Sequence, residues 1–230
     1  WAAKDWPQEL CDLYLSWSET SAEHLPLMVR RAVTGCARFD FYFPPYNALC
    51  STREMVCSFY GLDPSKRVVT VASSFPQAKF AKNGQLDFLQ SDWDKLGKSK
   101  IPGLEDARTV ATDERHALLR FQAWLRAAYY EWGPFQMLVK PHPADDVTDW
   151  LGFFEETGAK VMQMDYIFNL LAASDIHIAR AECITIPEAW MAGVMETEPC
   201  VLGKIDPSGP IRDIQNAFTS PDTTAEFIEY

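Results

Sequence analysis

Hydrophobic and polar positions alternate in blocks along the second half of the chain, and the blocks have two different periods. Short apolar runs rich in β-branched residues, bounded by Gly, Pro or polar residues, are typical of buried strands. They predict strands at 68–72, 136–139, 160–162, 175–179 and 199–202. Between them, apolar residues recur at three- and four-residue spacing, which predicts helices at 113–132, 147–157, 166–173 and 187–192. Since strands alternating with helices form βαβ units, we expect an α/β fold with a Rossmann-like parallel sheet and flanking helices.

The segment before this alternation, residues 1–60, follows a different pattern. Residues 41–46 (FYFPPY) are aromatic and proline-rich, which is more typical of a docked linker than of a regular element, although these rings could also stack on a sugar. The segment either completes the sheet or is the remnant of a preceding domain. We therefore divide the chain into a helical and linker segment, 1–60, and a Rossmann-like domain, 61–230. Apolar spacing in the first segment predicts helices at 7–17, 22–30 and 47–60, the last ended by Gly61.

Charge and cysteine content narrow the classes of partner. The 230 residues include 21 basic and 32 acidic side chains, a formal net charge of −11. Because such a surface repels phosphate backbones, we expect no nucleic-acid partner, whereas a few fixed cations in a cleft still suffice for a small anion. No apolar run reaches the roughly 18 residues of a membrane span. The six cysteines are scattered without metal-ligand spacing, so we expect no metal, reduced thiols and a cytoplasmic location.

Candidate functional residues follow three of the predicted strands. Since the carboxyl ends of parallel strands meet at one edge of a sheet, we expect these loops to lie close together. Cations and hydroxyls at such an edge suit a phosphate ester, and a carboxylate suits the hydroxyls of a ribose. The pattern therefore predicts a nucleotide site. The residues concerned are Ser73 and Ser74 after the first strand, Lys140 and His142 after the second, and Arg180, Thr185 and Glu188 after the fourth.

Each candidate also has a purely structural interpretation. His142 lies between two prolines and either contacts a ligand or caps a backbone carbonyl in a rigid turn. Arg180 could form a surface ion pair, and Glu188 could be favourable charge in the first turn of a helix. His177 lies inside a strand, where a packed core residue is the more frequent role. We interpret Asp145 and Asp146 as the N-terminal charge of the next helix rather than as a metal site.

In the order of its motifs, the chain resembles the C-terminal domain of GT-B glycosyltransferases that build bacterial surface polymers. The motifs are Lys140-Pro141-His142-Pro143 after a strand, Ser174-Asp175 before a strand, and Pro187-Glu188-Ala189 opening a helix. The stretch from Val33 to Asp40 is similar to the Gly-x-x-Arg-x-Asp stretch that precedes this domain in the family, and it adds Arg38 to the candidates. Capsule and lipopolysaccharide transferases and the CDP-glycerol glycerophosphotransferase group are the most similar members.

The resemblance implies roles for particular residues. His142 and Pro143 match the His-Pro motif that contacts the nucleotide, often a cytidine nucleotide, and Glu188 matches the acid that binds the ribose. The loop that holds the donor phosphate in the family carries Cys183 here in place of a serine, so Thr185, backbone N–H groups or Arg180 would supply that contact. Residues 194–198 look like an insertion before the last strand. No catalytic base is identified.

The function expected from these observations is donor binding in a glycosyltransferase or glycerophosphotransferase. The domain 61–230 would hold a nucleotide-activated sugar or polyol, as one half of a GT-B architecture, for transfer to a carbohydrate or lipid-linked acceptor. No cofactor is expected. The family also leads us to expect a peripheral position at the inner face of the cytoplasmic membrane. Two alternatives stay open: a sugar-nucleotide epimerase of related architecture, and a non-catalytic module that binds a nucleotide sugar or a partner protein.

Overall fold

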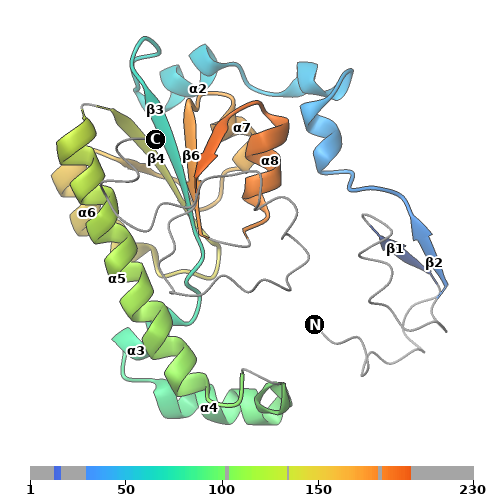
Figure 1. Cartoon of the computed structure of the whole chain (residues 1–230), viewed down its shortest axis with the longest axis vertical. Helices are drawn as coiled ribbons and strands as arrows, with labels where there is room; N and C mark the ends of the chain where they lie inside the picture. The colour runs from blue at the N-terminus through green and yellow to red at the C-terminus, as the bar shows by residue number, and fades with distance from the viewer. Residues whose placement is uncertain (1–12, 17–29, 102–103, 134, 181–182, 198–230) are drawn as a thin grey trace.

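A parallel five-stranded sheet lies at the centre of the described part of the molecule (Figure 1). The structure is a computed structural model, and it describes residues 13–16, 30–101, 104–133, 135–180 and 183–197. Numbered by their order in the chain, the strands of this sheet lie in the spatial order 3-2-1-4-5, which is typical of doubly wound nucleotide-binding folds. This confirms the expected α/β class. In spatial order the strands are β5 (Lys160–Val161), β4 (Gln136–Pro141), β3 (Val68–Ser73), β6 (Ile176–Ala179) and β7 (Met195–Thr197).

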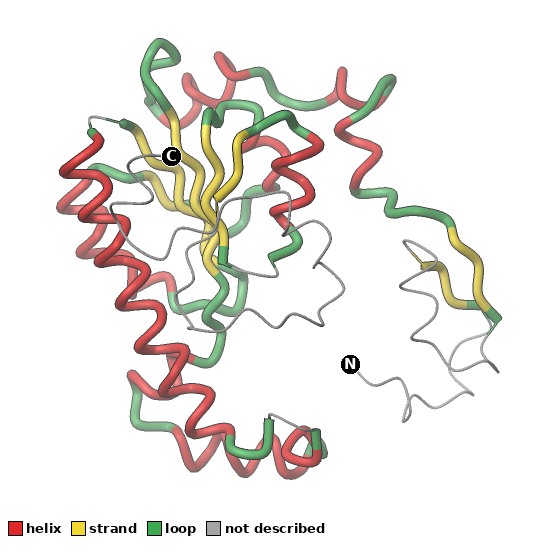
Figure 2. The backbone as a smooth tube through the Cα atoms, viewed as in Figure 1, coloured by secondary structure: helices red, strands yellow, loops and turns green. Residues whose placement is uncertain are grey.

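Helices cover both faces of the sheet (Figures 1 and 2). One face packs against α5 (Ala107–Trp132), η6 (Val147–Trp150) and α6 (Leu151–Thr157). The other face packs against α2 (Arg53–Tyr60), α7 (Ile167–Leu171) and α8 (Thr185–Met191).

The central strand β3 shows why the sheet must be covered on both sides. All six of its residues are buried. Val69 and Val71 pack into the cluster on the α5 face, together with Phe121, whereas Val68 packs into the cluster on the α2 face, together with Val56. Since successive side chains of a strand point to opposite faces, a continuous apolar run needs a hydrophobic layer on each side.

The start of the described chain differs from the sequence prediction. Residues Tyr14–Ser16 form strand β1, so the helix predicted at 7–17 is wrong there. This strand pairs in parallel with β2 (Arg31–Val33) in a two-stranded sheet of its own, so these two strands do not complete the central sheet. The helix predicted at 22–30 lies almost wholly outside the described residues.

The rest of the first segment packs against the domain. Two short 3-10 helices, η3 (Phe39–Tyr42) and η4 (Tyr46–Leu49), precede α2. The helix predicted at 47–60 is therefore confirmed only from its second turn, because Thr52 caps α2 by accepting a hydrogen bond from Met55 N. Cys57 of α2 shares a hydrophobic cluster with residues of the sheet. The division of the chain at residue 61 stays a prediction.

Three helices between β3 and β4 are absent from the prediction. They are α3 (Ala78–Lys82), α4 (Leu86–Lys95) and η5 (Lys98–Lys100), and α5 begins six residues earlier than expected, where Asp106 caps it. Leu89 and Trp93 of α4 pack on Ala107 and Ala111 of α5. These helices and the first turns of α5 extend this helical layer past the carboxyl edge of the sheet (Figure 1).

The last described strand corrects a prediction. Residues 194–198 were interpreted as an insertion, but Met195–Thr197 form β7, which pairs in parallel with β6. The strand predicted at 199–202 lies outside the described residues. The polar composition Met-Glu-Thr hides this strand because β7 is the outermost strand of the described sheet, next to β6 alone.

Gly133 ends α5 at a point where a side chain does not fit. A Cβ at this position would lie 2.4 Å from the carbonyl oxygen of Tyr129, far inside van der Waals contact. We expect Gly133→Ala to lower the free energy of unfolding by about 1–2 kcal/mol, because the helix end must shift to relieve this overlap. Gly152→Ala is the matched control: a Cβ at Gly152 in α6 meets no atom within 4 Å, so the substitution should raise stability by about 0.5 kcal/mol. Urea unfolding measures both, and equal effects would contradict the clash.

An ion pair joins α3 to the start of η6, and it makes the free energy of unfolding depend on pH in the acid range. Lys82 Nζ lies 2.8 Å from Asp146 Oδ2, and Asp146 Oδ1 accepts the N–H of Thr148. Hydrogen bonding by Lys82 lowers the pKa of Asp146 from 3.8 to about 2. Because the folded-state pKa is depressed, the ion pair stabilises the fold above about pH 4, and this contribution is lost as the pH falls from about 4 to about 2.

We therefore expect Asp146→Asn to reduce the free energy of unfolding by about 1 kcal/mol at neutral pH, a value discounted for solvent exposure. The deficit should shrink when unfolding by urea is repeated at about pH 3. A deficit that is the same at both pH values would show that the capping geometry of Asp146, and not its charge, is what matters.

Candidate functional site

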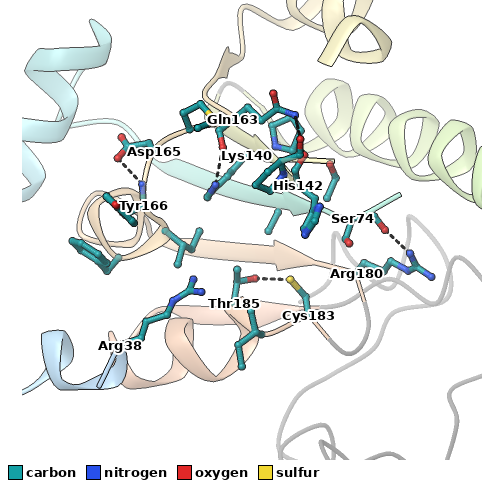
Figure 3. A pocket seen from close by; sticks show the side chains of 18 of the residues that line it. Arg38, Ser74, Lys140, His142, Gln163, Asp165, Tyr166, Arg180, Cys183 and Thr185 are labelled. Carbon is teal, nitrogen blue, oxygen red and sulfur yellow. Dashed lines mark hydrogen bonds between the residues drawn. The ribbon is translucent and has the colours of Figure 1, made fainter. Parts of the chain in front are cut away.

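A cleft of about 870 Å³ opens at the carboxyl edge of the central sheet (Figure 3). This is within the usual range for small-molecule sites. The cleft brings together part of the first segment and the loops that follow strands β3, β4, β5 and β6. Nine of the candidates from the sequence line it: Arg38, Ser73, Ser74, Lys140, His142, Pro143, Arg180, Cys183 and Thr185.

Arg180 spans the point where the strand order reverses, between β3 and β6. Its guanidinium donates a hydrogen bond to the carbonyl of Ser74 and stacks on the ring of Phe75, 5.2 Å from the ring centroid. A second contact joins it to Glu114 at 3.4 Å. Burial raises the pKa of Glu114. Ligands of doubly wound folds bind at this crevice, so Arg180 is a positioned cation at the expected place.

A half-buried carboxylate, that of Asp145, holds the His142 loop in place. Asp145 accepts hydrogen bonds from Ser73 Oγ (2.9 Å), Phe75 N (2.8 Å) and His142 N (3.3 Å). Burial raises the pKa of Asp145. The sequence interpretation of Asp145 as helix N-terminal charge is thus wrong, because this side chain joins the loops after β3 and β4. The interpretation is correct for Asp146, which caps η6.

The imidazole of His142 is exposed in the cleft and its tautomer is fixed. Nδ1 accepts the N–H of Ala144 at 3.1 Å, so in the neutral ring the proton lies on Nε2. The side-chain amide of Gln163 donates to the backbone carbonyls of His142, Pro143 and Asp145 and fixes the loop from the other side. His142 therefore presents an N–H donor on a rigid turn.

Lys140 is the second cation of the cleft. Its Nζ donates to the carbonyl of Gln163 at 3.0 Å, and the charge of Asp165 favours its protonated form. Burial lowers the pKa of this half-buried ammonium group. An ammonium group that is partly removed from water interacts more strongly with an anionic ligand than one on the surface does.

Two further side chains that follow β6 line the cleft, those of Cys183 and Thr185. Thr185 Oγ1 lies 3.1 Å from Cys183 Sγ and 2.9 Å from Nε2 of His177. His177 is fully buried, which lowers its pKa to about 3 and confirms its interpretation as a core residue. Burial also raises the pKa of the Cys183 thiol. Both side chains line the cleft as expected, but the thiol is held neutral and is a poor donor to phosphate.

Glu188 is the one candidate that the structure places outside the cleft lining. Its side chain is completely buried, with Oε1 2.6 Å from Nε of Arg38 and Oε2 accepting the hydroxyl of Tyr42 at 2.7 Å. Burial raises the pKa of Glu188 and, with the Glu188 charge, that of Tyr42. In this structure Glu188 holds Arg38 in the cleft wall, and the direct ribose contact implied by the family resemblance stays a prediction.

Three residues of the site were missed by the sequence reasoning. Gln163, Asp165 and Tyr166 follow β5 and line the cleft beside Lys140 (Figure 3). The rule that selected the other loops, a polar residue after a parallel strand, applies to this one too. A strand is predicted at 160–162 and β5 lies there, so this signal could have found the loop that follows it.

The cleft concentrates positive charge in an acidic protein. Arg38, Lys140 and Arg180 line it, and among the described lining residues Asp165 is the acidic side chain. Beside these cations stands the Nε2–H of His142, whereas the hydroxyl of Ser73 already donates to Asp145. Such a set can bind and neutralise phosphate oxygens. The described residues include no group of three or more His, Cys, Asp or Glu side chains arranged to hold a metal ion.

Comparison with known proteins gives a distant structural likeness. No protein-family model matches this chain, and neither does any curated protein sequence. Solved structures that resemble it include two variants of the wall teichoic acid polymerase TagF, each with one histidine substituted. The TM-scores are 0.48 and 0.49 at 14% sequence identity, and the matches cover 83% of this chain and 40% of TagF. The chain therefore spans less than half the length of that polymerase. Within the described residues, no helix is both long and apolar enough to cross a membrane.

Proposed function

We propose that this chain is the donor-binding half of a GT-B transferase, which holds a nucleotide-activated sugar or polyol phosphate in the cleft at the carboxyl edge of its sheet. The observation that supports this most strongly is the cation set of Arg38, Lys140 and Arg180 at the crevice of a doubly wound sheet. In a chain of net charge −11, such a local reversal of sign favours an anionic small molecule over any other partner.

The cations also suggest how the domain assists transfer. When the bond to the donor phosphate breaks, negative charge grows on the departing phosphate. Lys140 and Arg180 are held in place by Gln163 and Ser74 before the donor arrives, so they stabilise that charge without reorganising. His142 adds an N–H donor from Nε2. The residues named here bind and orient the donor, and the catalytic base and the acceptor site belong to a part of the enzyme that we do not assign.

Of the two alternatives, the epimerase is less favoured by the geometry. An epimerase needs an acid and a base that face the sugar ring. Among the described lining residues, Asp165 is the one carboxylic acid. It already accepts hydrogen bonds from Tyr60, Tyr166 and Asn169. A non-catalytic nucleotide-sugar module is supported by Cys183, since a neutral thiol stands at the phosphate loop. Action on a lipid-linked acceptor at the inner face of the cytoplasmic membrane stays a prediction.

Calorimetric titration of the purified chain with CMP, CDP, UMP and UDP tests the proposal, with His142→Ala as the variant and His116→Ala as its matched control. His116 is exposed on α5, away from the cleft lining. We expect micromolar to low-millimolar binding, strongest for a cytidine nucleotide, and a loss of about tenfold (about 1.4 kcal/mol) with His142→Ala alone. Tighter binding of uridine nucleotides would refute the cytidine preference, and no binding of any of the four would refute donor binding.

A further inference from the structure

Three aromatic rings are stacked on one wall of the cleft. Phe168 lies parallel to Phe41 at a centroid distance of 4.9 Å and an angle of 8°, and parallel to Tyr166 at 5.4 Å and 13°. Phe41 comes from η3 in the first segment, whereas Tyr166 is the N-cap of α7 and Phe168 lies in its first turn. All three line the cleft. The stack therefore joins two distant parts of the chain at the binding site.

The ring of Tyr166 stacks on Phe168 yet stays largely exposed to solvent. Tyr166 is 68% exposed, whereas Phe41 and Phe168 are both partly buried. Other aromatic rings, such as those of Phe59 and Phe88, are similarly exposed, but the ring of Tyr166 differs from them in lining the cleft. The exposed ring of Tyr166 extends an ordered stack into the cleft, where one more planar group can be added.

The position of Tyr166 relative to the cations suits a nucleotide. In Figure 3 Tyr166 lies at one end of the cleft and Arg180 at the other, with Lys140 and His142 between them. A nucleotide has the same polarity, with a flat aromatic base at one end and phosphates at the other. We infer that Tyr166 stacks the nucleobase of the donor, an inference that rests on the proposed function and assigns the base subsite within it.

Asp165 gives this subsite a preference among bases. Its carboxylate lines the cleft next to Tyr166 and accepts three hydrogen bonds, from Tyr60 Oη, Tyr166 N and Asn169 Nδ2. Since a carboxylate has about four acceptor positions, one remains for a ligand. An exocyclic amine, such as that of cytosine, can donate to it, whereas the carbonyl oxygen of uracil at the same ring position is repelled. The subsite therefore selects cytosine over uracil.

The test compares ligands that share the diphosphate and differ in the base: CDP, UDP and inorganic pyrophosphate. We expect Tyr166→Ala to weaken CDP about tenfold, which is about 1.4 kcal/mol and lies in the range of a single base stack, and to leave pyrophosphate unchanged. Tyr166→Phe keeps the ring and should bind CDP like the parent chain. Because the Tyr166 side chain is exposed, Tyr166→Ala should keep its unfolding temperature, which is measured in parallel.

For the base preference, we expect the parent chain to bind CDP about fivefold more tightly than UDP, and Asp165→Asn to abolish that ratio. Tyr60→Phe removes one hydrogen bond of Asp165 but keeps its charge, so the ratio should persist. If CDP binds the parent chain and Tyr166→Ala equally, the stacking subsite is wrong while donor binding stands. If neither CDP, UDP nor pyrophosphate binds the parent chain, the proposed function itself fails. A parent chain that binds UDP as tightly as CDP overturns the role of Asp165.

Discussion

Lys140→Met is expected to weaken the binding of CDP about a hundredfold, which corresponds to about 2.8 kcal/mol. The ammonium group is half-buried in the cleft, where its interaction with phosphate oxygens is less screened by water than at the surface. Charge-assisted hydrogen bonds to phosphate are about twice as strong as neutral ones, and Lys140 supplies up to two of them beside its bond to Gln163. Methionine keeps most of the side-chain volume, so the fold should be retained. Calorimetry with CDP and with inorganic pyrophosphate measures the effect.

Lys160→Met is the matched control for this prediction. It removes the same charge from β5, where Lys160 is exposed and outside the cleft lining. If both variants lose CDP affinity equally, the effect comes from the net charge of the protein rather than from a contact in the cleft. An unchanged CDP affinity in Lys140→Met would remove Lys140 from the site.

Glu188→Ala is expected to lower the free energy of unfolding by about 3 kcal/mol. It removes a completely buried carboxylate that pairs with Arg38 and accepts from Tyr42, and breaking such a pair typically costs 3–5 kcal/mol. We take the lower end because the Arg38 side chain is 46% exposed and can turn toward water. Since Arg38 then leaves the cleft wall, affinity for pyrophosphate should fall as well, by about tenfold.

This variant separates two roles for Glu188. Tyr42→Phe serves as the control, because it removes the contact to Oε2 and leaves the pair with Arg38, so it should cost about 1.5 kcal/mol of stability and spare pyrophosphate binding. If Glu188→Ala is as stable as the parent chain, binds pyrophosphate normally and loses only nucleotide affinity, Glu188 contacts the ribose as the family resemblance implies.

The central sheet was predictable because both hydrophobic periods are visible in the sequence. A run such as Val68-Val69-Thr70-Val71-Ala72 leaves no polar face, so it fits only a strand covered on both sides. Helix α4 escaped prediction because it is stabilised by contact: Leu89 and Trp93 pack on α5, which lies later in the chain. Strand β7 escaped because an outer strand of a sheet needs no apolar run.

The site was predictable where one local rule was enough. Side chains that follow β3, β4 and β6 meet at one edge because parallel strands end there, and nine candidates do line the cleft. The role of Glu188 was not predictable in this way. Its partner Tyr42 lies 146 positions earlier, and no local pattern shows that a buried carboxylate contacts that segment. The stack of Phe41 on Phe168 is hidden for the same reason.

Backbone amide chemical shifts of the isotope-labelled chain, followed during titration with CDP, test most directly whether the donor binds at the carboxyl edge of the sheet. We expect the largest changes in the loops after β3, β4, β5 and β6, at Ser74, His142, Tyr166 and Cys183, with Lys140→Met abolishing them at the same CDP concentration. Changes confined to other surfaces, such as the α5 positions Asp113 to Arg120, or no changes at all, would contradict a donor site in this cleft.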